Sequence, residues 1–313
     1  MPKVREKTLS YRRAEWFGGA SGITLERCVR DAHKALKNVG DRSIFHGDQI
    51  ARSAKQKDAA GGGMLLHITT ETPGESASVV PKVAPTTEEI DLKTARPPTD
   101  GEWLDGDAFL FVKNDHVCIC TTGIRDGAIR FFLHQFFRKA KIRKDAVNFD
   151  LMKVADMKKV KMLHSQGVKE LVIRAAMYKA ANSFVRRKSR AMSMAGAVAK
   201  HAKAILGKPN DVSPDGLRVL VTLKTDERFG KKAFALGEAE IETLAADVVN
   251  KPEEDDDYVI ITKTGQKITP KEIFMRSRVS IESDGKTVRC DKAWNELVHF
   301  FNALNKAGIL EGG

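Results

Sequence analysis

The feature that most constrains the fold is a pair of short apolar runs near the middle of the chain. Residues 108–112 and 117–121 flank the polar turn Lys113-Asn114-Asp115-His116. Both runs are rich in β-branched or aromatic residues, a composition typical of paired strands. The pattern therefore predicts a β-hairpin here.

An aromatic helix is predicted directly after this hairpin. Over residues 128–139, apolar side chains recur at the three- and four-residue spacing of a helix face. These residues are Ile129, Phe132, Leu133, Phe136 and Phe137. A further strand is predicted over residues 169–174. Strands and helices thus alternate without a repeat, and we expect an α+β fold of mixed sheets with packed helices.

The chain length favours two domains, because domains usually contain roughly 100–200 residues. A helical composition over residues 175–206 ends at Gly207-Lys208-Pro209, and a linker follows at 210–215. We therefore predict an N-terminal α+β domain over 1–209, with a basic region at 125–208. A C-terminal α+β domain is predicted over 210–313.

Residues 71–100 have a different composition. Five prolines (Pro73, Pro81, Pro85, Pro97 and Pro98) interrupt regular structure in this segment. We expect a long surface excursion with one short strand at 78–80. Loops of this length are usually either functional or mobile.

Charge is concentrated in one part of the sequence. The whole chain carries a net charge of +12. Residues 125–208 contain 21 Lys and Arg against 5 Asp and Glu, a net of +16, and the remaining 32 basic and 36 acidic residues give −4. A basic field confined to one region is typical of a protein that binds a polyanion.

The candidate nucleic-acid-binding residues are the clustered lysines and arginines of this basic region. They are Lys141, Arg143, Lys158, Lys161, Arg186, Arg187, Lys188 and Arg190. The last four fall on the helix predicted over 175–206, which can follow a phosphate backbone. No aromatic RNA-binding pattern or helix-turn-helix accompanies them, so contact without base readout is expected. A solvated basic face and a helix lying on a membrane remain as alternatives.

Catalytic chemistry has one weak candidate. Asp284-Gly285-Lys286 matches the end of a nuclease pattern, with Asp257 as an upstream carboxylate. An Asp-Gly pair is better explained as a hairpin turn. We therefore predict no catalytic residues, and a metal-dependent nuclease of a phage-defence system is the alternative function.

Cofactor and metal motifs are also weak in the sequence. There is no dinucleotide or phosphate-loop fingerprint. The four cysteines form no CxxC pair, although His116, Cys118 and Cys120 alternate on one strand and could share a face. We expect no cofactor and no metal. The first residues have no apolar segment typical of a secretion signal, which predicts a cytoplasmic protein.

The central stretch resembles a known family. The order GDAFLFVKNDHVCICTTGIRDGAIRFFLHQFF, then a polar helix, then GVKELVIRAA is similar to the RexA phage-exclusion proteins of lambdoid phages. The similarity is one of pattern over about two-thirds of the chain, and it does not extend to the first 60 residues or to the Pro-rich segment 71–100.

This resemblance implies a two-domain homodimer that binds DNA with little sequence preference. It implies a role in antiviral defence by abortive infection, in which the protein senses phage DNA and activates a membrane protein as effector partner. The helix predicted over 291–307 carries Trp294, Phe300 and Phe301. We expect it to close the C-terminal domain, near the dimer interface.

Overall fold

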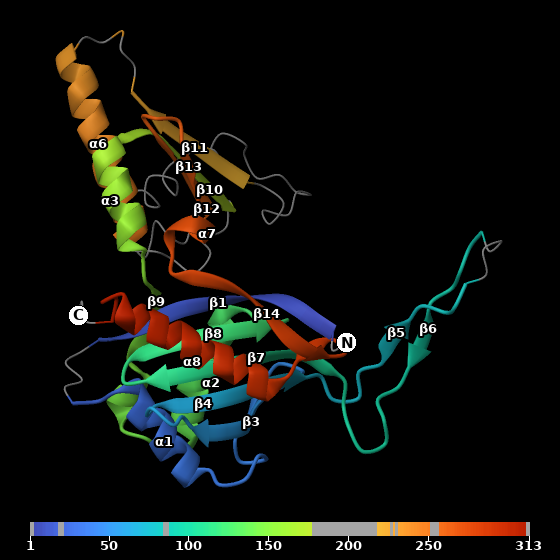
Figure 1. Cartoon of the computed structure of the whole chain (residues 1–313). Helices are drawn as coiled ribbons and strands as arrows, with labels where there is room; N and C mark the ends of the chain where they lie inside the picture. Colours follow the sequence, from blue (N-terminus) through green and yellow to red (C-terminus); the bar gives the residue numbers. More distant parts are fainter. Residues whose placement is uncertain are drawn as a thin grey trace, which may run out of the picture. The chain divides into compact units, whose positions relative to one another are not determined.

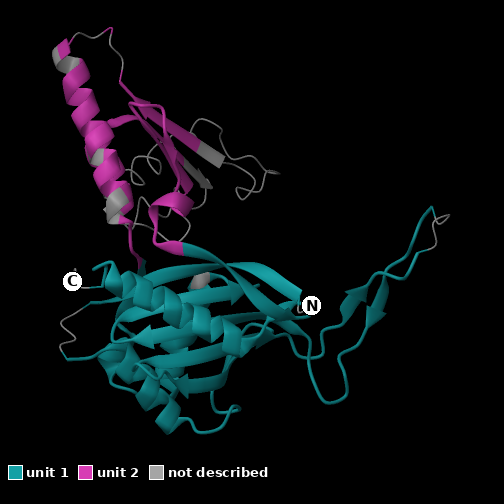
Figure 2. Ribbon diagram, in the orientation of Figure 1, with its two compact units in different colours: residues 1–152, 277–313 teal, residues 153–276 magenta. Residues whose placement is uncertain are grey.

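The computed structural model describes residues 3–17, 22–83, 88–176, 218–225, 228, 231–250 and 257–310. The fold is α+β, as predicted. The chain forms two compact units, residues 1–152 with 277–313 and residues 153–276 (Figure 2). The second unit is therefore inserted into the sequence of the first.

Unit 1 is built on a large sheet that combines consecutive strands with strands far apart in the sequence. Its strands lie in the order β15-β14-β1-β8-β7-β4-β3-β2, and β9 also pairs with β1. The strands are β1 (Lys3–Trp16), β2 (Ser43–His46), β3 (Gln49–Asp58), β4 (Met64–Glu71), β7 (Leu104–Lys113), β8 (His116–Thr122), β9 (Phe149–Lys153), β14 (Arg276–Asp284) and β15 (Thr287–Val288).

The predicted hairpin is confirmed as β7 and β8. These strands pair antiparallel with Ala108 opposite Thr121 and Phe111 opposite Cys118. The turn between them places Asn114 at a φ of 53°. Asn tolerates this left-handed conformation better than most residues, so the local sequence suits the turn.

Helices cover both faces of this sheet. Successive side chains of a strand point to opposite faces. Leu110 belongs to the core beneath α1 (Leu25–Ala35) and α2 (Asp126–Lys139), whereas the ring of Phe111 lies 4.9 Å from that of Phe301 in α8 (Cys290–Lys306). A short 3-10 helix, η1 (Lys144–Val147), follows α2.

The C-terminal helix packs on unit 1, which corrects the predicted domain boundary. Figure 1 shows α8 lying across the strands, where Trp294 Nε1 donates a hydrogen bond to the Leu66 carbonyl at 3.0 Å. The predicted boundary at 209/210 also separates two paired strands, since Ile173 lies opposite Val221. Long-range strand pairing, which the local pattern does not encode, therefore sets the division. The apolar stripe of α8 is buried within the chain and does not close a separate domain.

Unit 2 is a four-stranded antiparallel sheet with helices on it. Its strand order is β11-β10-β12-β13. Leu171 and Ile173 of β10 join the buried core with Ile241, Leu244 and Val248. The elements are α3 (Met157–Gln166), β10 (Val168–Ala176), β11 (Arg218–Lys224), α6 (Lys231–Asn250), β12 (Asp257–Thr262), β13 (Lys267–Ile268) and α7 (Pro270–Ile273).

The Pro-rich excursion belongs to unit 1 and contains two short strands. β5 (Ala77–Val79) and β6 (Lys93–Ala95) pair only with each other among the described strands (Figure 1). The predicted strand at 78–80 is thus present, displaced by one residue. The helix predicted over 175–206 lies outside the described residues, apart from Ala175 and Ala176, which end β10. Within the described ranges, every helix is too short or too polar to cross a lipid bilayer.

Candidate nucleic-acid interface

Lys141 and Arg143 lie in the turn that joins α2 to η1. The aromatic face of α2 is buried, with Phe132, Phe136 and Phe137 almost fully covered. The helix therefore turns its basic residues outward at its C-terminal end. The exposed basic side chains at the end of α2, in this turn and at the start of η1 are Arg138, Lys139, Lys141, Arg143 and Lys144. They are called the α2–η1 cluster below.

Two members of the α2–η1 cluster already have partners. The Arg143 guanidinium donates two hydrogen bonds to the Asp145 carboxylate, at 3.1 and 2.7 Å. Lys139 Nζ donates to the Ser43 carbonyl at 2.9 Å. Cations near the last turn also stabilise the helix dipole. These contacts give Arg143 and Lys139 structural roles beside any role in binding.

The other members, Arg138, Lys141 and Lys144, make no ion pair with any described residue. Lys141 adopts a φ of 54°, which places it at the bend of the chain. Exposed, unpaired cations can exchange hydration water for phosphate oxygens without first breaking a salt bridge. They are the members of the α2–η1 cluster best suited to contact phosphate.

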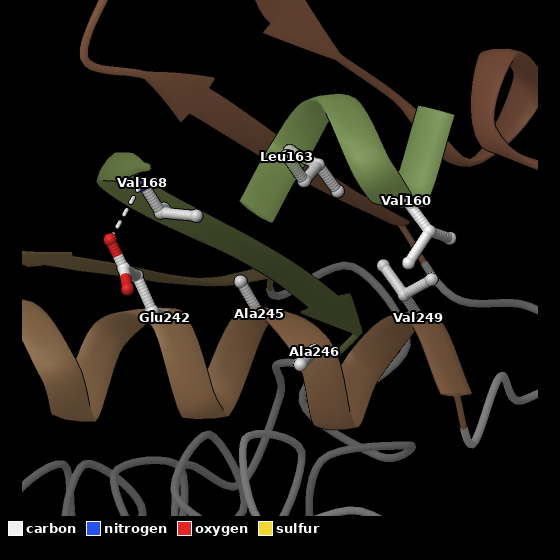
Figure 3. Close-up of a pocket in the computed structure, with 7 residues that line it drawn as sticks. All are labelled: Val160, Leu163, Val168, Glu242, Ala245, Ala246 and Val249. Carbon is white, nitrogen blue, oxygen red and sulfur yellow. Dashed lines mark hydrogen bonds between the residues drawn. The ribbon is translucent and has the colours of Figure 1, made fainter. Parts of the chain in front are cut away.

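Lys158 and Lys161 lie on α3 in unit 2. They stand three residues apart in this helix. Lys161 is exposed, while the side chain of Lys158 lies outside the described residues. The same helix contributes Val160 and Leu163 to an apolar hollow (Figure 3).

The hollow beside α3 is lined mainly by aliphatic side chains. Figure 3 shows side chains of α3, β10 and α6 around this small hollow. Its one charged residue, Glu242, accepts a hydrogen bond from the Val168 backbone at 3.4 Å. With a single carboxylate that is already hydrogen-bonded, the hollow has no set of groups for acid–base chemistry.

Arg186, Arg187, Lys188 and Arg190 lie outside the described residues. The structure thus places Lys141 with Arg143 in one turn of unit 1, and Lys158 with Lys161 on one helix of unit 2. The sequence prediction for the other four stays a prediction.

The residues of the nuclease alternative belong to different units. Asp284 ends β14, and Gly285 follows at a φ of 71° in the tight turn to β15. Arg5 donates to the Gly285 carbonyl at 2.9 Å, which anchors this turn to β1. Asp257 lies in unit 2 opposite Arg174. The described residues contain no group of three or more metal-ligating side chains. Asp284 is therefore explained as a turn residue.

The strand that carries His116, Cys118 and Cys120 is part of the core. Both thiols are buried, and burial raises the pKa of Cys120 to about 11 and that of Cys118 further. His116 Nδ1 lies 2.6 Å from the Tyr11 hydroxyl. The cysteines remain protonated at neutral pH, which is unfavourable for metal binding and for nucleophilic attack.

A buried polar cluster around Asp107 was missed by the sequence analysis. Asp107 is fully buried, its Oδ2 accepts a hydrogen bond from the Thr287 hydroxyl, and His67 Nε2 lies 3.4 Å from the same oxygen. The nearby Cys290 thiol has its pKa raised to about 11 by burial. An aspartate directly before the apolar run of β7 was the available signal, but its partners come from β4 and β15, far away in sequence.

The cluster fastens the C-terminal segment to the sheet. Thr287 begins β15, just before α8, and its bond to Asp107 joins this segment to β7. Because the pKa of the neighbouring, half-buried Cys290 thiol is raised, this thiol is protonated at neutral pH, and the geometry favours a structural role. No protein-family model matches the chain, and no curated protein matches it either.

Proposed function

We propose that this protein binds DNA through the phosphate backbone, with little sequence preference, as the sensor of a phage-exclusion system. The observation that carries the proposal is the charge distribution. Residues 125–208 hold a net of +16, while the rest of the chain holds −4. Such a field attracts a polyanion and raises its rate of association.

The exposed cations of the described part support phosphate contact. Arg138, Lys141 and Lys144 of the α2–η1 cluster have no carboxylate partner in the described part of the chain, and Lys161 is exposed on α3. Lysine and arginine contacts to phosphate position a protein on DNA without reading bases. Uniform binding to unrelated sequences follows from this.

The role in phage exclusion rests on the resemblance to RexA phage-exclusion proteins. The same resemblance supports a homodimer and a membrane protein as effector partner. A plating assay tests this part separately: cells that express the chain with its neighbouring genes should reduce phage plaques. Equal plaque numbers with and without these genes would remove the defence role while leaving DNA binding intact.

DNA binding is tested by fluorescence anisotropy with two duplexes of equal length and unrelated sequence. We expect affinities within about threefold of each other, and a log affinity that falls linearly with log salt. A strong preference for one duplex, or affinity independent of salt, would contradict the proposal.

The same protein incubated with supercoiled DNA and Mg²⁺ or Mn²⁺ tests the nuclease alternative. The proposal expects intact DNA. Cleavage that disappears in Asp284→Asn would establish the alternative, because Asn-Gly also suits the turn and the fold should be retained.

A further inference from the structure

Lys141 has a backbone conformation that favours glycine. Its φ is 54°, in the left-handed region. Among the described residues other than glycine, only Asn114 and Lys141 have a positive φ. The short polar side chain of Asn tolerates this conformation, whereas lysine has no such compensation. The folded chain therefore loses some stability at Lys141.

The end of α2 requires this conformation. Ala140 is the C-cap residue of the helix. The Lys141 backbone N–H donates to the Arg138 carbonyl at 3.0 Å. The next N–H, of Ile142, donates to the Phe137 carbonyl at 3.1 Å, and these two side chains pack in the same apolar core. This is the Schellman motif, in which the residue at the position of Lys141 is left-handed and is usually glycine.

The lysine side chain adds little to this helix end. It is exposed and makes no ion pair within the described part of the chain. The last carbonyls that a basic side chain could cap, those of Phe136, Phe137 and Arg138, already accept backbone hydrogen bonds. Arg138 and Lys139 supply positive charge to the last turn, where it stabilises the helix dipole. A glycine at position 141 would keep the motif and remove its strain.

We propose that Lys141 is the main phosphate contact of unit 1, and that its unfavourable backbone conformation is retained for this contact. The ammonium group binds the non-bridging phosphate oxygens of the DNA backbone and displaces condensed counterions. This role rests on the proposed function, because the phosphate belongs to DNA. Loss of binding together with a gain in stability is the result typical of a residue kept for function.

The variant Lys141→Gly in the full chain tests both parts. Its melting temperature should rise by about 2–4 °C, because glycine adopts a positive φ without strain. Its affinity for a duplex should fall about fivefold at about 0.1 M salt. The slope of log affinity against log salt should flatten by about one unit, the change expected for one lost phosphate contact.

Two further variants separate charge from conformation. Lys141→Arg keeps both the charge and the strain, and it should retain the affinity and the melting temperature of the wild type, since arginine also binds phosphate. Lys37→Gln removes one exposed lysine outside the basic region. It should leave the affinity and the salt slope close to those of the wild type.

The outcomes distinguish this role from the proposed function. If the wild type binds DNA and Lys141→Gly binds equally well, the role of Lys141 is overturned and the proposed function stands. A lower melting temperature in Lys141→Gly would show that the lysine serves the helix end, which also overturns the role. A wild-type chain that does not bind DNA would contradict the proposed function, and the role of Lys141 with it.

Discussion

The two units cover their sheets with helices in different ways. In unit 1, helices α1 and α2 cover one face and α8 covers the other, and the buried side chains include Phe109, Phe111 and Phe136. In unit 2, the buried core lies between the sheet and helices α3 and α6, and it is mostly aliphatic. The larger and more aromatic core removes more apolar surface from water. Unit 1 is therefore expected to be the more stable unit.

The order of the units by net charge is the reverse of their expected order by stability. Unit 2 contains 24 Lys and Arg against 16 Asp and Glu, a net of +8, and unit 1 contains the remaining 29 and 25, a net of +4. Clustered like charges repel and cost stability. Under the proposed function, unit 1 supplies stability and unit 2 supplies most of the positive charge for DNA binding.

The largest effect is expected from the aromatic core of unit 1. Phe137 is fully buried, and Phe137→Ala should lower the free energy of unfolding by about 3–5 kcal/mol. Hydrogen exchange followed by mass spectrometry should show the loss of protection in β7 and β8. The matched variant Leu171→Ala should instead affect β10 and β12. Equal loss of protection in both units for either variant would contradict the claim that each core stabilises its own unit.

Acid should weaken unit 1 before unit 2. His33 is buried, its Nδ1 donates to the Val29 carbonyl, and its Nε2 accepts from the Ser53 hydroxyl. Burial lowers the pKa of His33 to about 4 from 6.5. The unfolded chain therefore binds a proton that the folded chain excludes, and stability falls as pH drops from 6.5 toward 4.

Lowering the pH through this whole range should reduce the free energy of unfolding by about 3 kcal/mol through His33 alone. The pKa values of His116 and His134, also in unit 1, are lowered by burial and act in the same direction. Urea unfolding at pH 7 and pH 5 measures the difference, which should be smaller in His33→Gln. An identical pH dependence in that variant would contradict the assignment.

A smaller effect is expected from the bond that fastens the C-terminal segment. Thr287→Val keeps the side-chain shape but removes the donor to Asp107, leaving a buried carboxylate with one hydrogen bond fewer. This should cost about 1–3 kcal/mol. The control Thr243→Val, on an exposed side of α6, should change stability by about 0.5 kcal/mol or less. Equal costs for the two variants would show that the Asp107 contact contributes nothing.

Local patterns predicted the elements well, and distant pairing explains what they missed. The β7–β8 hairpin and α2 are encoded within about forty residues, so alternation and helical spacing were sufficient. Local patterns did not predict that the chain returns to unit 1, because Arg5 and Gly285, which are in contact, lie 280 residues apart. The domain boundary was wrong for this reason.

The basic residues of the candidate interface could be predicted from the sequence, but their ion-pair partners could not. Charge and spacing selected Lys141, Arg143, Lys158 and Lys161. They did not distinguish Arg143, which is held by Asp145, from Lys141, which has no ion pair with the described residues. The Asp107 cluster could not be predicted because three strands, distant in sequence, bring its members together.

The most direct test of the central claim is the salt dependence of DNA affinity in a charge-reversal variant. The variant Arg186→Glu/Arg187→Glu/Arg190→Glu removes three cations of the basic region. The control Lys37→Glu/Lys57→Glu/Lys306→Glu changes the net charge equally at exposed lysines outside that region. Both folds should be checked by circular dichroism.

We expect the first variant to bind all duplexes more weakly, with a slope of log affinity against log salt that flattens by about one unit for each lost phosphate contact. The control should keep a slope close to that of the wild type. Equal affinities and slopes in the two variants would contradict binding through the basic region.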